Sequence, residues 1–329
     1  MNKVISVVIF LVSLFFYASV SAKQAGEGYT LFRYDIPTEL GNNTSLFDLD
    51  EGGTIVGTYF GGGFQHAFGS DQNDESITEY NVEGNFINFA TAISDLAVVG
   101  STEQPDGRRV GTIWPRDSSS KTWKKILEPL LPSLPKQGRP IIIDINPFLG
   151  TSLLGVNNRG HLVGAVQKLD STSRGFVIAK GQISVFDYPG AQSTEAEGIR
   201  KNGTIVGNYV LNGRRHGFLL NPSGKKFASF DVDVGGNKKA CETFIYDTND
   251  AGDLAGVYCV VCGCEQKRGY VFTRKQQLIS ITYPGVETTN TEVRGLDEEG
   301  NIVGLFDTET LDSNNKLIKE RHGFIGLLK

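Results

Sequence analysis

The sequence has little of what builds helical, membrane-embedded or nucleic-acid-binding proteins. It contains one methionine and few long apolar stretches with helical period, so little of the chain is expected to be helical. After the first residues, no apolar run is long enough to cross a bilayer. The net charge of −5 is spread evenly and includes no basic stripe, which disfavours nucleic acid as a partner.

Signatures of common catalytic sites are also missing. There is no Gly-x-Ser-x-Gly turn, phosphate-binding loop, His-Glu-x-x-His pair or calcium loop. Histidine occurs four times, and His66, His216 and His322 fall at one repeated position where Arg174 and Arg268 also occur. A residue that exchanges with arginine is expected to be a structural hydrogen-bond donor rather than a catalyst. We expect no cofactor.

The first residues follow the order of a secretory signal peptide. Lys3 precedes the apolar run 4–12, and small residues follow at Val20-Ser-Ala22. This order predicts export, with removal of residues 1–22; an uncleaved membrane anchor is the alternative. No cysteine follows the cleavage site, so a lipid-anchored form is not expected. We predict that residues 23–329 form a single domain that is secreted or periplasmic.

A short apolar segment that ends in glycine recurs six times in the remaining chain. The copies are Gly53-Thr-Ile-Val-Gly57, Asp95-Leu-Ala-Val-Val-Gly100, Gly160-His-Leu-Val-Gly164, Gly203-Thr-Ile-Val-Gly207, Gly252-Asp-Leu-Ala-Gly256 and Gly300-Asn-Ile-Val-Gly304. Their closing glycines lie 43, 64, 43, 49 and 48 residues apart. A period in the forties built from short alternating segments is typical of propeller blades. We predict an all-β, six-bladed β-propeller with four antiparallel strands per blade, named A to D.

The two ends of the predicted domain fit together. Residues 194–231 show one blade most clearly, because Asn202-Gly203 between two alternating segments is a strong hairpin signal. Residues 29–35 fit a D strand, whereas residues 322–328 at the end of the chain fit a C strand. We predict that the N-terminal strand completes the last blade and closes the ring, which leaves no exposed sheet edge.

The period is broken once, between Gly100 and Gly164. Residues 110–114 fit the third strand of this blade, and residues 115–150 are expected to be an inserted segment. Prolines at 129, 132, 135 and 140 prevent a long helix there. We expect one short helical turn and an extended piece that caps an end of the ring. The insertion either carries a binding loop or lid or decorates the surface.

Several motifs resemble those of the bacterial extracellular HAF repeat proteins. They include His66-Ala-Phe68, the His-Gly-Phe copies and the corner Phe186-Asp-Tyr-Pro-Gly-Ala191. Residues 155–164 and 295–304 are similar to that family's Gly-Ile-Asn-turn-Gly-x-Ile-Val-Gly unit. The resemblance covers nearly all of the chain after the signal peptide and implies export and a repeat β fold. The family has no agreed activity, so no catalytic residue is implied.

All four cysteines fall in the predicted fifth blade, at Cys241, Cys259, Cys262 and Cys264. An even number of cysteines in an exported protein favours disulfides. A hairpin turn at 249–252 brings Cys241 within reach of either Cys259 or Cys262, and Cys264 then pairs with the other one. The alternative is a zinc site with sulfur ligands; we expect no metal.

Charged residues on the innermost strands form the candidate site. Aligning the blades on their closing glycines places Phe47, Leu154, Glu197, Tyr246 and Arg294 in one row. The row two residues earlier contains Ser45, Ser152, Glu195, Phe244 and Glu292. Buried charges need partners or a ligand, and A strands line the central channel of a propeller. We therefore predict ligand-binding roles for Glu195, Glu197, Tyr246, Glu292 and Arg294; the alternative is a water-filled channel with idle charges.

These features predict an exported binding module. Its channel face, rimmed by D–A and B–C loops, would recognise a polar ligand, a glycan or a protein partner outside the cytoplasm. The alternative is an extracellular glycan-active enzyme, a hydrolase or lyase, that uses Glu195, Glu197 or Glu292 as acid or base. Propellers host both classes, so the fold does not decide between them.

Overall fold

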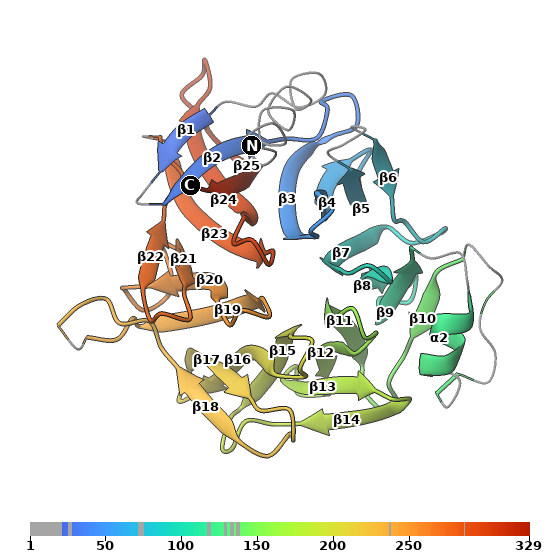
Figure 1. Cartoon of the computed structure of the whole chain (residues 1–329). Coiled ribbons are helices and arrows are strands. Elements are labelled where there is room, and N and C mark those ends of the chain that lie inside the picture. The colour runs from blue at the N-terminus through green and yellow to red at the C-terminus, as the bar shows by residue number, and fades with distance from the viewer. Residues whose placement is uncertain are drawn as a thin grey trace, which may run out of the picture.

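Apart from one helix, the regular elements of the described residues are strands in mainly antiparallel sheets arranged around a central axis (Figure 1). The computed structural model describes residues 22–25, 28–71, 76–116, 120–127, 130–131, 135, 139–236, 238–285 and 287–329. The predicted signal peptide, except for Ala22, lies outside the described residues. The fold is all-β and propeller-like, as the glycine-ended repeat predicted.

Strand pairings divide the first half of the chain into three sets, which we call sheets 1 to 3. Sheet 1 contains β3 (Asn42–Leu49), β4 (Thr54–Gly61), β5 (Phe64–Asp71) and β6 (Ile77–Glu79). Sheet 2 contains β7 (Ile87–Ile93), β8 (Ala97–Glu103), β9 (Arg109–Pro115) and β10 (Ile141–Ile143). Sheet 3 contains β11 (Gly150–Val156), β12 (Leu162–Gln167), β13 (Ser173–Ala179) and β14 (Gln182–Phe186). One parallel bridge, between Gln65 and Ile87, joins sheets 1 and 2.

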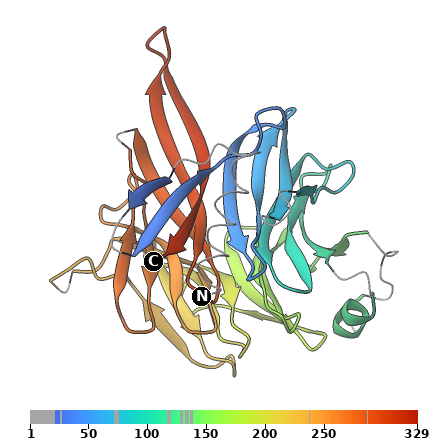
Figure 2. The same cartoon turned by 45° about the horizontal axis from the view of Figure 1, so that its top comes forward.

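The second half repeats the same order in sheets 4 to 6. Sheet 4 contains β15 (Ser193–Ile199), β16 (Ile205–Leu211), β17 (Arg214–Leu220) and β18 (Phe227–Phe230). Sheet 5 contains β19 (Glu242–Thr248), β20 (Leu254–Cys259), β21 (Arg268–Phe272) and β22 (Leu278–Ile281). Sheet 6 begins with β23 (Thr288–Leu296), β24 (Ile302–Leu311) and β25 (Leu317–Leu328). The β24–β25 hairpin rises above the loops around it (Figure 2).

The N-terminal strand completes sheet 6. β2 (Tyr29–Tyr34) pairs antiparallel with β25, from Tyr29 opposite Leu328 to Tyr34 opposite Gly323, and β1 (Ala22–Ala25) lies outside it. Sheet 6 in turn packs against sheet 1, because Val303 and Ile325 share one apolar cluster with Leu46. The predicted pairing of the two ends of the domain is therefore confirmed.

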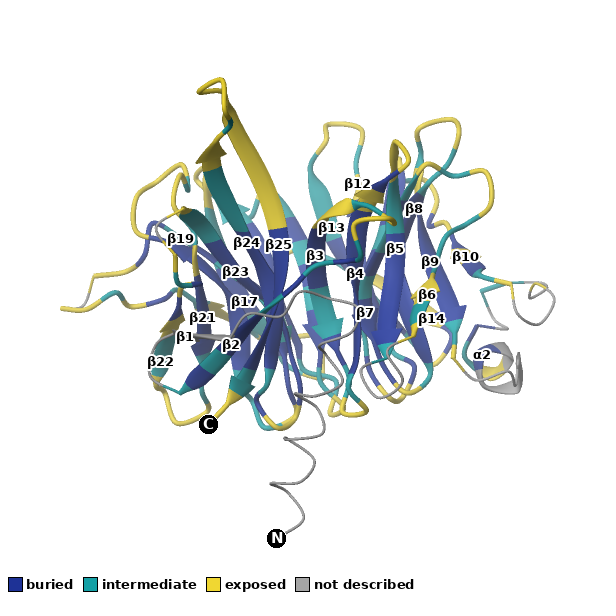
Figure 3. Cartoon of the chain, turned by 90° about the horizontal axis from the view of Figure 1, so that it is seen from above, coloured by how far each residue is buried: buried dark blue, intermediate teal, exposed yellow. Residues whose placement is uncertain are grey.

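The core lies between neighbouring sheets (Figure 3). The second strands β4, β8 and β20 are buried along almost their whole length, whereas the innermost strands β7 and β15 bury mainly every second residue. One repeated contact joins the C and D strands within a sheet at the position shared by histidine and arginine. Arg174 contacts Asp187 at 2.9 Å, His216 contacts Asp231 at 2.8 Å, and His322 contacts Asp35 at 3.0 Å. These contacts give the repeated position a structural role, as the exchange of histidine for arginine predicted.

The inserted segment completes sheet 2 instead of covering the ring. Its extended piece is β10, which pairs with β9 as a fourth strand. Its helix, α2 (Ser120–Leu127), lies at the outer edge of the molecule (Figure 1). Trp123 and Leu127 are buried in a cluster shared with sheets 2 and 3. We expected the extended piece to cap an end of the ring, but strand pairing places it at the periphery.

Two disulfides hold the loop between β20 and β21. Cys241 is bonded to Cys262, and Cys259 is bonded to Cys264. This is one of the two pairings that the sequence left open. The backbone N–H of Cys241 also donates to the Cys259 carbonyl at 2.8 Å, as the predicted hairpin requires. Because all four sulfurs are bonded in pairs, they do not provide the thiolates that a zinc site needs.

Among the described residues, no helix is both long and apolar enough to span a membrane.

Candidate functional site

The closing glycines of the repeat create the row of residues that faces the channel. In each sheet, the closing glycine of strand B pairs with an A-strand residue directly before a β-bulge; in sheet 4, Gly207 is opposite Ala196. A Cβ on any of the six glycines would lie only 1.8–2.0 Å from an A-strand carbonyl oxygen. Only glycine allows this approach, and the bulge leaves one residue per strand unpaired.

The unpaired residues form the row that the sequence alignment predicted, with one addition. They are Phe47, Thr91, Leu154, Glu197, Tyr246 and Arg294. Thr91 comes from sheet 2, which the alignment did not cover. Four members of the row line the cavities on both of its sides: Leu154, Glu197, Tyr246 and Arg294. The row therefore lies in the middle of the channel, between two cavities.

The larger cavity lies on the side of the D–A and B–C loops and has a volume of about 810 Å³. Of the predicted ligand-binding residues, Glu195, Glu197, Tyr246 and Arg294 line it. Arg215, which the sequence analysis did not single out, lines it too. The cavity thus brings together charged and aromatic side chains from sheets 4, 5 and 6.

Glu292 is the exception among the predicted residues, because it does not line this cavity. Its side chain is 2% exposed, and one carboxylate oxygen accepts from Lys267 Nζ at 2.7 Å while the other accepts from Arg294. Burial alone would raise the pKa of Glu292, but the two cations lower it to about 2. Glu292 is thus an ionised partner that holds Arg294 in place from outside the cavity.

Arg294 lies among aromatic rings in the middle of the channel. Its guanidinium carbon is 3.9 Å from the centroid of the Tyr246 ring and 5.6 Å from that of Phe47. Cation–π contact of this kind stabilises a charge that is partly removed from water. Nε of Arg294 is buried and has no hydrogen-bond partner among the described residues. Although burial opposes its charge, Tyr246 and Glu292 keep the pKa of Arg294 above its ordinary value.

Glu195 and Glu197 lie two residues apart on β15 but have different partners. Glu195 forms an ion pair with Arg215 at 2.7 Å, and Arg215 lies 5.2 Å above the Phe244 ring. Glu197 accepts a hydrogen bond from Asn208 Nδ2 at 3.0 Å. Burial and the neighbouring Glu195 raise the pKa of Glu197 to about 7. One cavity therefore holds a carboxylate that is paired with an arginine beside a carboxylic acid that is neutral below that pH.

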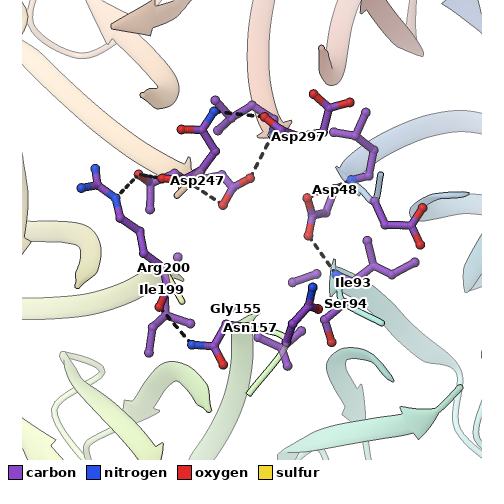
Figure 4. Close-up of a pocket in the computed structure, with 18 of the residues that line it drawn as sticks. Asp48, Ile93, Ser94, Gly155, Asn157, Ile199, Arg200, Asp247 and Asp297 are labelled. Atoms are coloured by element: carbon purple, nitrogen blue, oxygen red, sulfur yellow. Dashed lines mark hydrogen bonds between the residues drawn. The ribbon is translucent and has the colours of Figure 1, made fainter. Parts of the chain in front are cut away.

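The opposite mouth of the channel is lined by the A–B turns and is mainly acidic. Asp48 and Asp247, the residues after the bulge in sheets 1 and 5, point into this opening (Figure 4). Asp48 accepts from the Ile93 N–H at 2.8 Å, and Asp247 accepts from the Leu296 N–H at 3.0 Å. Each aspartate thus accepts a backbone hydrogen bond from the next sheet along the chain, which gives it a structural role.

The two aspartates were not predicted, although the sequence contains a signal for them. Glycine or alanine occupies the equivalent position in the other four sheets: Ala92, Gly155, Gly198 and Gly295. A Cβ on Gly295 would meet Asp48, and one on Gly198 would meet Asp247. Burial raises the pKa of Asp247 to about 7 and that of Asp48 well above its ordinary value.

The two mouths differ in charge. Nine acidic and three basic residues line the mouth on the A–B side, whereas four of each line the larger cavity. The field along the channel is therefore negative at one end and close to balanced at the other, where the arginines lie. A ligand with negative charge is therefore disfavoured at the first end.

The raised pKa of Glu197 predicts how stability depends on pH. Between about pH 4.5 and about pH 7 an unfolded glutamate is ionised while Glu197 in the folded chain is still neutral, so stability falls as the pH rises. Replacing Glu197 by glutamine removes the contribution of this residue to the pH dependence of stability. The similar contribution of Asp247, whose pKa is also raised to about 7, remains. We expect the urea midpoint of Glu197→Gln to decline less steeply over this window than that of the unchanged protein. Identical pH profiles would contradict the assignment.

Comparisons with known proteins reveal the fold alone. No protein-family model matches the sequence, and no curated protein matches it. Among solved structures, TolB from Acinetobacter baumannii superposes with a TM-score of 0.51 at 9% identity, covering 93% of this chain and 78% of that one. Putative TolB from Agrobacterium tumefaciens gives 0.52 at 8% identity, covering 92% and 99%. Because the identities are only 8–9%, these superpositions show a similar β-propeller architecture and nothing beyond the fold.

Proposed function

We propose that the chain is an exported, closed six-bladed β-propeller that binds a small polar ligand in the larger cavity, which Arg294 lines. Closure is supported by the pairing of β2 with β25 and by the packing of sheet 6 against sheet 1. Export is supported by the signal-peptide order of residues 1–22 and by the two disulfides, which form and persist in oxidising compartments.

The cavity of about 810 Å³ is the observation that carries this proposal. Its volume falls within the range of small-molecule sites, roughly 300–1,000 Å³. Aromatic rings of Phe244 and Tyr246 face it together with the charged groups of Glu195, Arg215 and Arg294. Rings with a few converging polar groups suit a saccharide, which presents both apolar C–H faces and hydroxyl groups. Because these groups lie inside a recess, a small ligand or chain end fits them better than a flat protein surface.

Filling the cavity tests the proposal without removing a charge. Ser152 on β11 lines the cavity, so Ser152→Trp should occupy it. We expect an array of saccharides and other small polar compounds to identify binders of the unchanged protein, and Ser152→Trp to weaken their binding at least about tenfold. Ser184→Trp, at an exposed position on the outer strand β14, is the matched control and should bind normally. Equal binding by both variants would contradict the proposed site.

One observation favours the alternative, a glycan-active enzyme. Glu197 is neutral below about pH 7, and Glu195 beside it is paired with Arg215. A general acid next to a carboxylate is the arrangement that glycoside hydrolysis uses. Against this alternative, Glu195 is held by Arg215 and Glu292 is covered. Glu197→Gln distinguishes the two functions: an enzyme loses its turnover of an identified saccharide, whereas a binding protein shows no turnover before or after the change.

A further inference from the structure

We infer that the ligand of the larger cavity is an acidic saccharide whose carboxylate or sulfate binds beside Arg294. This inference rests on the proposed function and names the class of ligand that the same cavity takes. It is carried by three features of the described residues: an excess of positive charge around Arg294, an arginine with unused hydrogen-bond donors, and the acidic excess that is confined to the opposite channel mouth.

The first feature is a charge imbalance around Arg294. Arg215 pairs with Glu195, and both line the cavity; Arg294 lines it too and shares the carboxylate of Glu292 with Lys267, and these last two residues lie outside the lining. Three cations thus share two carboxylates, which leaves one positive charge in excess while Glu197 is neutral. An anionic group of a ligand would compensate that excess in a partly buried site.

The protonation state of Glu197 determines whether the excess positive charge remains. The groups that face it are Glu195 on its own strand, Asn208 on β16, Arg215 on β17, Tyr246 on β19 and Arg294 on β23. While Glu197 is protonated it leaves the excess charge intact and can donate a hydrogen bond to an anion. Once ionised, it neutralises the excess and repels an anion. Binding of an acidic ligand should therefore weaken as the pH rises through about 7.

The second feature is the unused hydrogen-bonding capacity of Arg294. A guanidinium carries five N–H donors, and Glu292 is the one hydrogen-bond partner of Arg294 among the described residues. The rings of Tyr246 and Phe47 lie near the guanidinium, but a ring offers no oxygen acceptor. Arginine with free donors matches a carboxylate or sulfate in both charge and geometry.

The third feature is the polarity of the channel. Acidic residues outnumber basic ones three to one at the A–B mouth, whereas the larger cavity carries as many arginines as acids. Arg109 is one of these arginines and lies 5.3 Å from the centroid of the Phe89 ring. An anion is therefore disfavoured at the A–B mouth, whereas no net negative charge opposes its entry on the D–A and B–C side.

An array that pairs neutral saccharides with their carboxylated and sulfated counterparts tests the inference. At about pH 6 we expect the acidic members to bind at least about tenfold more tightly than their neutral counterparts. At about pH 8 this advantage should shrink several-fold, because Glu197 is then ionised. Carboxylated and sulfated members on the same sugar backbone show which anion the cavity prefers.

Two variants and one control separate the contributions. Glu197→Gln stays neutral and should keep the affinity for acidic members at about pH 8. Arg294→Lys retains the charge but loses the planar donors, and should weaken the acidic members more than the neutral ones. Glu309→Gln, in an ion pair on the protruding hairpin, should behave as the unchanged protein.

The outcomes distinguish this inference from the function on which it rests. Neutral members that bind as tightly as acidic ones would overturn the acidic ligand and leave the binding function standing. An unchanged pH dependence in Glu197→Gln would overturn the role given to that residue. A protein that binds no member of the array, acidic or neutral, would overturn the proposed function itself.

Discussion

Replacing Gly207 by alanine should prevent folding or destabilise the protein by more than about 4 kcal/mol, a cost that single substitutions rarely reach. The added Cβ would lie 2.0 Å from the Glu195 carbonyl oxygen and 3.0 Å from the Cα of Ala196. Both are backbone atoms of the adjacent A strand, so no side-chain rotation relieves the clash. To make room, β15 would have to move away from β16, which breaks their hydrogen bonds and displaces Glu197.

Gly150→Ala is the matched control for this substitution. Gly150 also lies in a strand and is buried, but the atoms nearest to an added Cβ are 3.5 Å away, an ordinary contact. We expect its free energy of unfolding in urea to stay within about 1 kcal/mol of the unchanged protein. Equal stability of Gly207→Ala and Gly150→Ala would show that the A strand of sheet 4 does not approach the closing glycine as described.

Glu292→Gln should destabilise the protein by about 3–5 kcal/mol, the cost of removing one partner from a buried ion pair. The carboxylate is 2% exposed and accepts from both Lys267 and Arg294. Glutamine keeps one oxygen but loses the negative charge, so two partly buried cations are left close together without a carboxylate between them. Affinity for the cavity ligand should fall as well, because Arg294 is no longer held in place.

A surface pair provides the control for the buried one. Glu309 pairs with Lys319, whose side chain is 67% exposed, and Glu309→Gln should cost no more than about 1 kcal/mol. The pH dependence gives a second check on Glu292. Since its pKa is lowered from 4.5 to about 2, its stabilisation is complete above about pH 4.5 and is lost as the pH falls toward 2. Equal losses in both variants would contradict the buried pair.

The glycine-ended repeat was enough to predict the row of channel residues, and the reason is steric. Each closing glycine sits opposite the residue before the bulge, so counting back from the glycine finds the unpaired residue. In five sheets the offset is ten residues, but it is nine in sheet 2, where Thr91 precedes Gly100. The shorter A–B turn of that sheet, between Ile93 and Ala97, accounts for the difference. A fixed alignment therefore could not place Thr91.

The positions of two parts of the site were missed in the sequence analysis. Strand alternation assigns Asp48 to the face opposite Phe47, but the bulge between Leu46 and Asp48 lets both residues reach the channel. Burial of Glu292 depends on Lys267, which comes from the B–C loop of the preceding sheet. A contact between loops and strands of different sheets leaves no local pattern, so Glu292 was predicted to bind ligand directly.

The channel exists only if the last sheet meets the first, so the pairing of the chain ends underlies every residue assigned to the cavity. Thr30 on β2 lies directly opposite Leu327 on β25, and directly opposed residues have Cβ atoms about 5 Å apart. Thr30→Cys combined with Leu327→Cys therefore places two thiols within reach of a short crosslinker.

Mass spectrometry of the crosslinked double variant measures this pairing most directly. We predict that the peptides containing positions 30 and 327 become linked in nearly every molecule, with the native disulfides intact. Thr30→Cys combined with Ser229→Cys, on the exposed face of β18 in sheet 4, should give no link. Failure of the first pair to link in the folded protein, or linking of the second pair, would contradict the closed ring and the cavity built on it.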